Sequence, residues 1–172
     1  KGLRELIADK NIPLVLAGVD YLLPIYREAN TYPHLTDADL PGSPQMLSAK
    51  DLHQRAWELV KPRFSQAEAE QRELFATLLG RADPRAVSGL RHALGAASQG
   101  RIASLFVALD KQVWGQFDAE TNTLDTHAEM QPGDQDLLDR LAAQTFANSG
   151  EVFAVEAGDV PGGEAFAAIL RY

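Results

Sequence analysis

The chain of 172 residues has the length of one ordinary domain, and such a chain can bury a hydrophobic core without disulfides. Its composition, 45% hydrophobic and 23% charged, excludes collagen-like, low-complexity and disordered classes. With no Cys, a disulfide scaffold, a thiol nucleophile and a cysteine-ligated metal site are excluded as well. The formal net charge is −8, and residues 86–172 hold only five basic side chains against 12 acidic ones, which argues against binding of a phosphate backbone.

No uncharged run approaches the ~18 residues that a membrane span needs, and the sequence shows no signal peptide. We therefore expect a cytoplasmic protein with no membrane partner. The chain begins at Lys1 rather than Met, so we expect it to be a fragment of a longer protein. Its acidic surface is expected to keep the protein soluble or to face a basic partner.

The first part of the chain has the pattern helix, strand, turn, helix. Apolar residues at helical spacing predict a helix over residues 2–9, and the apolar run at 12–17 predicts a buried strand. Asp20 is placed to cap a second helix that ends near Ala29. Residues 30–47 show neither a helical nor a strand period, so we interpret them as the connection between two structural units.

Helical patterns follow this connection. Ser48 and Asp51 have the spacing of a capping box, with Asp in the place of the usual Glu. Pro62 interrupts the pattern, either as a kink or as the first turn of a second helix. Gly80 is expected to cap the C-terminus, and Pro84 to start a further helix.

The rest of the chain alternates strands and helices, which makes the fold class α/β. Asp134 and Asp136 favour the N-terminus of a helix, and Gly162-Gly163 is interpreted as a tight turn before the last strand. The strand at 12–17 is expected either to pair elsewhere or to lie in a partial, incompletely built unit. We predict one mixed sheet from strands near 102–109, 112–117, 151–155 and 165–171, covered by helices at 84–98 and 133–148.

The motifs that carry common enzyme chemistry are missing. There is no HExxH, GxGxxG, P-loop or GxSxG motif, and the four His residues show no i, i+4 ligand spacing. We therefore expect no catalytic residue, no cofactor and no metal. Asp125-Thr126-His127 leaves an alternative open, an uncharacterised enzyme that uses Asp125 and His127 as an acid–base pair. Trp114 is interpreted as either a core residue or an interface anchor.

Several segments resemble signatures of bacterial homologues of the archaeo-eukaryotic peptide-chain release factors, the superfamily that includes Pelota. Residues 13–29 (PLVLAGVDYLLPIYREA) are similar to the segment that closes the second domain of these proteins. Residues 96–107 (AASQGRIASLFV) resemble the start of the third domain's core. The similarity continues through the later helix and strands, at residues 137–139, 142–145, 150–155, 161–163 and 168–172.

This resemblance implies that residues 1–47 are the tail of a release-factor-like second domain plus a linker. Residues 48–172 would be a third-domain-like module, a mixed sheet sandwiched by helices as in the ribosomal proteins that bind kink-turn RNA, with residues 1–47 as a helical lead-in. In release factors and Pelota this domain contacts the ribosome and a partner GTPase without doing chemistry. No GGQ motif occurs, and Gly162-Gly163-Glu164 lies at the wrong end of the chain to replace it, so peptidyl-tRNA hydrolysis is not expected.

We therefore hypothesise a non-catalytic interaction module of a release-factor-like, ribosome-associated bacterial protein. Trp114, Arg101 and His127 are its candidate interaction residues, and its partner would be a protein or the ribosome. The Lys and Arg residues beyond Ala86 are spread over five segments, so we expect no direct kink-turn RNA binding by this chain. Any ribosome contact would run through protein surfaces or through the more basic segment at 50–85.

Overall fold

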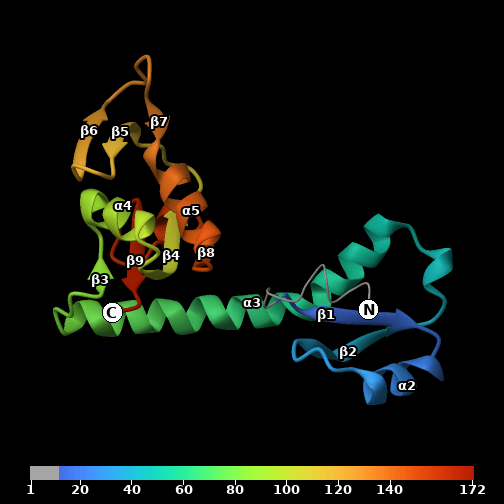
Figure 1. Cartoon of the computed structure of the whole chain (residues 1–172). Helices are drawn as coiled ribbons and strands as arrows, with labels where there is room; N and C mark the ends of the chain where they lie inside the picture. The colour runs from blue at the N-terminus through green and yellow to red at the C-terminus, as the bar shows by residue number, and fades with distance from the viewer. Residues whose placement is uncertain (1–11) are drawn as a thin grey trace. The chain divides into compact units, whose positions relative to one another are not determined.

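The computed structural model describes residues 12–172, which form two compact units that divide between Ala67 and Glu68 (Figure 1). The division falls inside helix α3 (Ala49–Gly80), so each unit contains part of this helix. The helix expected over residues 2–9 lies outside the described residues.

The first unit is built on a parallel strand pair. Strand β1 (Leu14–Gly18) is followed by helix α2 (Leu22–Ala29) and strand β2 (Leu35–Pro41). Leu14 lies opposite Leu35 and Gly18 opposite Pro41, which is the strand–helix–strand arrangement that parallel pairing requires. As expected, the strand near 12–17 pairs outside the larger sheet of the chain.

Two local expectations for this unit are wrong. Asp20 does not cap α2: Tyr21 holds the N-cap position without a side-chain bond, because the Leu22 N–H turns back to the Val19 carbonyl at 2.9 Å. The stretch at 30–47 also contains strand β2. Its sequence, LTDADLP, does not alternate between apolar and polar residues, and the strand is held by backbone pairing with β1.

The start of α3 follows the sequence pattern. After a short 3-10 helix η1 (Pro44–Met46), the Ser48 hydroxyl accepts from the Asp51 N–H at 3.2 Å. The Asp51 carboxylate in turn accepts from the Ser48 hydroxyl at 2.6 Å and from its N–H at 3.3 Å. These reciprocal bonds confirm the capping box, and they hold the pKa of Asp51 below its ordinary value.

Helix α3 continues through Pro62 over 32 residues. Proline removes one backbone donor, and Glu58, whose carbonyl is left without this partner, is exposed, so water can reach that carbonyl. The helix ends at Gly80 as expected. However, the residue in the left-handed conformation is Ala82, with φ 51°, and the Asp83 N–H closes the turn on the Leu78 carbonyl at 3.0 Å.

The second unit contains a four-stranded mixed sheet in the order β3-β9-β4-β8. Strand β4 is parallel to β8 and antiparallel to β9, and β9 is antiparallel to β3. Helices cover both faces, which confirms the predicted α/β sandwich (Figure 1). The strands are β3 (Ala86–Val87), β4 (Ile102–Ala108), β8 (Glu151–Val155) and β9 (Phe166–Leu170).

One face of this sheet packs against helices α4 (Leu90–Ser98) and α5 (Leu137–Ala147). The other face packs against the end of α3, where Phe75 and Leu78 contact Phe106 and its neighbours. A buried polar contact crosses this second interface, since the Ser104 hydroxyl lies 2.9 Å from Gln71 Oε1.

A separate three-stranded antiparallel sheet has the order β6-β5-β7. Its strands are β5 (Trp114–Asp118), β6 (Thr123–His127) and β7 (Gln135–Asp136). The expectation that 112–117 joins the main sheet is therefore wrong. Residues 119–122 form a tight hairpin turn, in which Asp118 accepts from the Glu120 N–H at 2.8 Å, and this turn pairs β5 with β6.

The two predicted helices of this unit are shorter than expected. Residues 86–87 form β3, so the helix expected from Pro84 begins only at Leu90. Helix α5 begins at Leu137, where the Asp136 carboxylate caps the Leu138 N–H at 3.0 Å. A short 3-10 helix η2 (Ala157–Asp159) follows β8. The Gly162-Gly163 turn then leads into β9, with φ values of 85° and 76°, as predicted.

The first prediction concerns the end of α3 as part of the core of the second unit. Phe75 is 1% exposed, so Phe75→Ala should lower the free energy of unfolding by about 3–5 kcal/mol. Leu74 is 41% exposed on the same helix, so Leu74→Ala should cost less than about 1 kcal/mol. Urea unfolding followed by circular dichroism measures both variants, and equal effects would contradict this packing.

Candidate functional site

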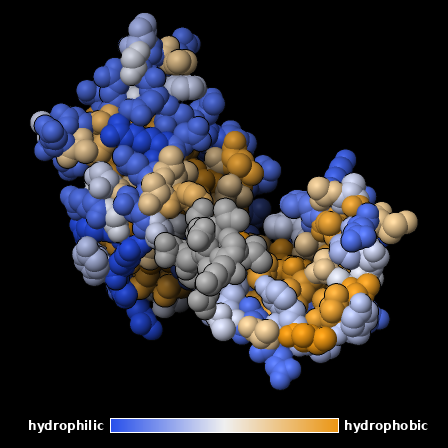
Figure 2. Space-filling view, turned by 45° about the vertical axis from the view of Figure 1, so that its right-hand side comes forward, coloured by the Kyte–Doolittle hydropathy of each residue, from blue (hydrophilic) through white to orange (hydrophobic). Residues whose placement is uncertain are grey.

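Two of the three candidate interaction residues meet on the three-stranded sheet. Trp114 at the start of β5 pairs directly with His127 at the end of β6, and with Asp136 of β7 on its other side. Paired residues in an antiparallel ladder share one face, so the indole and the imidazole lie next to each other. Trp114 is half-buried. The part of the surface that contains this sheet, at the top left of Figure 2, is mostly hydrophilic.

The carboxylate partner of His127 is Asp134 and not Asp125. His127 Nδ1 lies 2.8 Å from Asp134 Oδ2, which also accepts from the Gln131 N–H at 3.0 Å. Asp125 is exposed and lies opposite Gln116 in the β5–β6 pair. The acid–base pair considered from the sequence is therefore corrected to a hydrogen-bonded pair of His127 with Asp134, which closes the segment between β6 and β7.

The environment of Asp134 sets its protonation. Its side chain has no exposed surface, and this burial acts to raise its pKa. The hydrogen bonds from Gln131 and His127, together with the charge of His127, outweigh burial and hold the pKa of Asp134 below its ordinary value. Asp134 is therefore a buried carboxylate whose ionised form stabilises the loop that contains it.

Sequence reasoning assigned Asp134 to the N-terminus of a helix and missed this contact. The helix begins later, with Asp136 as its cap, which leaves Asp134 free to turn back toward β6. The two partners are seven residues apart, at a spacing that belongs to no recurring motif. Gly133, with φ 93°, is the signal in the sequence that could have indicated a turn at this point.

The third candidate, Arg101, lies between α4 and β4, on a different element from Trp114 and His127. Its guanidinium lies over the ring of Tyr172, 5.4 Å from the ring centroid, and Nη2 donates to the Tyr172 carbonyl at 3.4 Å. The Arg171 N–H donates to the Arg101 carbonyl at 2.9 Å, so the end of β9 holds this region in place. The structure thus separates Arg101 from the Trp114–His127 pair.

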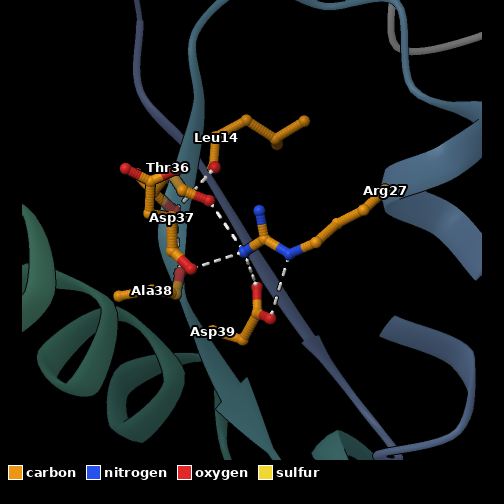
Figure 3. Close-up of polar contacts among 6 residues, drawn as sticks. All are labelled: Leu14, Arg27, Thr36, Asp37, Ala38 and Asp39. Carbon is orange, nitrogen blue, oxygen red and sulfur yellow. Dashed lines mark hydrogen bonds and ion pairs between the residues drawn. The ribbon is translucent and has the colours of Figure 1, made fainter. Parts of the chain in front are cut away.

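The first unit has a polar cluster around Arg27 that sequence reasoning did not single out (Figure 3). Arg27 Nη2 donates to the Thr36 and Asp37 carbonyls at 2.8 and 2.7 Å and to Asp39 Oδ1 at 2.6 Å. Thr36 Oγ1 donates to the Leu14 carbonyl at 3.1 Å. These contacts fix α2 to β2 and β2 to β1, so we assign Arg27 a structural role in this unit.

A hollow of about 120 Å³ lies at the carboxyl ends of β1 and β2. Its lining is mostly apolar, with Leu40, Pro41 and Leu52 among the side chains, and Arg55 is its one charged side chain. Among residues 12–172, no group of three or more His, Asp or Glu is arranged to hold a metal ion. No helix in the same range is long and apolar enough to cross a membrane.

The second prediction concerns the His127–Asp134 pair. Because the pKa of Asp134 is lowered by folding, its stabilising effect is complete above the ordinary value of 3.8 and is lost as pH falls below that value. Asp134→Asn should therefore lower the urea midpoint at about pH 7, and the difference from the native chain should shrink at about pH 3. Asp125→Asn, on the same hairpin, is the matched control and should leave the midpoint unchanged. A deficit of Asp134→Asn that is the same at both pH values would contradict this assignment.

Comparison with known proteins shows which solved structures have a similar fold and which family model the sequence matches. The fold is similar to the C-terminal domain of peptide chain release factor from Methanosarcina mazei, with a TM-score of 0.52 and 13% identity. The match covers 74% of this chain and 97% of that domain. Pelota from Archaeoglobus fulgidus matches with a TM-score of 0.42 and 20% identity, over 99% of this chain and 52% of Pelota.

An archaeal translation termination factor matches with a TM-score of 0.45 and 14% identity, over 93% of this chain and 43% of the factor. The chain thus spans about half the length of these two longer proteins. No curated protein matches the chain. The family model of bacterial archaeo-eukaryotic release factor family 3 matches residues 1–101, more than half of the sequence. The chain therefore belongs to bacterial archaeo-eukaryotic release factor family 3.

Proposed function

We propose that this chain is a non-catalytic interaction module of a release-factor-like protein that acts beside the ribosome in the cytoplasm. The observation that carries the proposal is membership of a release factor family, together with the fold shared with a release factor C-terminal domain. Fold alone does not determine function, so the surfaces of the module have to supply the specificity.

The proposed organisation assigns residues 48–172 to the third-domain-like module and residues 1–47 to the tail of a second domain plus a linker. The similar Methanosarcina domain covers 74% of this chain, which is about the share that residues 48–172 make up. The strand–helix–strand segment before Leu47 supports the second part, because a two-stranded sheet is marginal by itself and fits as the end of a larger one.

The Trp114–His127 pair is the proposed contact surface of the module. A half-buried indole next to an imidazole on a small sheet offers a large rigid contact area at a low entropic cost. Asp134 holds His127 in a defined orientation, so the pair is organised before a partner arrives. Arg101, stacked on Tyr172, offers a second and separate contact point.

The third prediction tests association with ribosomes. Co-sedimentation of the intact protein with bacterial ribosomes at low salt should recover it in the pellet. Trp114→Ala should weaken this recovery by about tenfold or more, as is typical of an interface anchor. Phe146→Ala removes an aromatic ring that is 76% exposed on α5 and serves as the matched control. The proposal would be contradicted if the native protein neither sediments with ribosomes nor recovers a translation GTPase in a pull-down at low salt.

The fourth prediction concerns RNA. Residues 68–172 carry eight basic and 16 acidic side chains, and Arg101 is already engaged with Tyr172. Phosphate-backbone binding requires several cations on one face, so we expect no kink-turn RNA binding at about 0.15 M salt. A filter-binding or anisotropy titration measures this. Micromolar affinity that falls on Arg101→Glu or Lys111→Glu would show that the module binds RNA directly.

A further inference from the structure

Strand β8 (Glu151–Val155) forms one edge of the four-stranded sheet, and within residues 12–172 no strand pairs with its outer side. The Leu109 N–H donates to the Val155 carbonyl at 2.8 Å, so the polar groups of Val155 face β4. In a parallel pair, the backbone N–H and carbonyl groups of successive residues point alternately toward the partner strand and away from it. The register of β8 with β4 is regular, so this alternation continues through the strand. The N–H and carbonyl groups of Val152 and Ala154 therefore point outward.

Apart from the charge of Glu151 at its first position, this edge lacks the features by which proteins usually block further pairing. It has five residues, no Pro and no Lys, and its register with β4 contains no bulge. By contrast, the opposite edge of the sheet is β3, which has only two residues. The sequence of β8, EVFAV, is mostly apolar, and Ala154 is exposed. An open apolar edge of this kind is suited to accept an added strand.

The charged residues beside β8 favour one kind of added strand over others. Glu151 and Glu156 flank the edge, both are exposed, and neither has an ion-pair partner among the described residues. The whole segment at 68–172 has a net charge of −8, counted from its eight basic and 16 acidic side chains. An extended segment with Lys or Arg at its ends would therefore be attracted to both ends of this edge.

Charge disfavours pairing of β8 with a second copy of itself. A parallel pair would place Glu151 next to its own copy. An antiparallel pair would bring together two copies of a segment, residues 68–172, whose net charge is −8. Like charges next to each other across strands are destabilising, so charge favours a basic partner segment over a second copy.

We propose that the outer edge of β8 binds an extended segment of a partner protein, flanked by Lys or Arg, which adds to the sheet as a fifth strand next to β8. This inference rests on the proposed function and specifies its partner as a basic, extended peptide. The backbone groups of Val152 and Ala154 supply the affinity, and Glu151 and Glu156 supply the preference for basic ends.

The test uses the peptide KKVTVTVKK as the probe, with EEVTVTVEE as its charge-reversed counterpart. Titration of the full chain at low salt, followed by amide NMR, should show binding of the basic peptide at least about tenfold tighter than of the acidic one. Before addition, the amides of Val152 and Ala154 should exchange faster with solvent than those of Phe153 and Val155. The basic peptide should slow exchange at Val152 and Ala154.

Two variants separate backbone pairing from charge. Ala154→Pro removes an N–H that points outward and leaves the bonds to β4 in place, so it should keep the thermal midpoint within a few degrees. It should weaken peptide binding at least about tenfold. Glu151→Lys combined with Glu156→Lys should reverse the preference between the two peptides, whereas Glu120→Lys, in the β5–β6 turn, should not.

The inference would be overturned by binding of neither peptide, by equal binding of both by the native chain, or by unchanged binding by Ala154→Pro. A shift pattern centred on elements other than β8 would overturn it as well. None of these results depends on ribosomes, so failure of the edge and failure of the ribosome proposal can be distinguished. If the native chain elutes as a dimer and Ala154→Pro as a monomer, the occupant of the edge would be a second copy, and the proposal would be wrong.

Discussion

The burial of strand β4 on both of its faces is the constraint on which the second unit depends. Ile102, Ser104, Leu105 and Phe106 are each at most 1% exposed, so neither face can be left to water. One face requires α4 and α5, and the other requires the end of α3. Parallel pairing with β8 then requires a long crossover, and this crossover contains both the three-stranded sheet and α5. The three-stranded sheet, which carries the Trp114–His127 pair, therefore lies in the crossover that the central strand requires.

Single polar interactions hold the smaller parts of the molecule, where apolar burial is limited. The three-stranded sheet has one buried aromatic anchor, Phe117, and its last loop is closed by the pair of His127 with Asp134. In the first unit, α2 buries no residue completely, and the Arg27–Asp39 contact holds it on β2. Such contacts contribute modest stability, but they fix the relative positions of elements that a small hydrophobic interface would not fix.

The distribution of charge separates the two parts of the chain chemically. Residues 1–67 contain eight basic and eight acidic side chains, whereas residues 68–172 contain eight and 16. Among residues 12–172, the second unit combines this acidic surface with a half-buried indole on the three-stranded sheet and an unpaired edge on the four-stranded sheet, and the proposed contacts with basic protein segments rest on these features.

The sequence was sufficient to predict those elements whose formation depends on residues close together in the chain. The apolar run of β4, the capping box of Ser48 and Asp51, and the glycine turn before β9 were all predicted, because neighbouring residues decide each of them. The family resemblance and the α/β class followed from the same segments and are confirmed. The secondary structure that needed no distant partner was therefore determined by the sequence alone.

Only the tertiary structure decided which strands share a sheet and which side chains meet. Strand β2 forms because β1 provides its hydrogen bonds, and β5 pairs with β6 rather than with β4, both of whose edges are occupied by β8 and β9. His127 contacts Asp134 rather than Asp125, because a loop conformation returns the more distant carboxylate to the imidazole. Pairing and side-chain contact depend on distances between residues far apart in the chain, and a sequence pattern records only the spacing of neighbours.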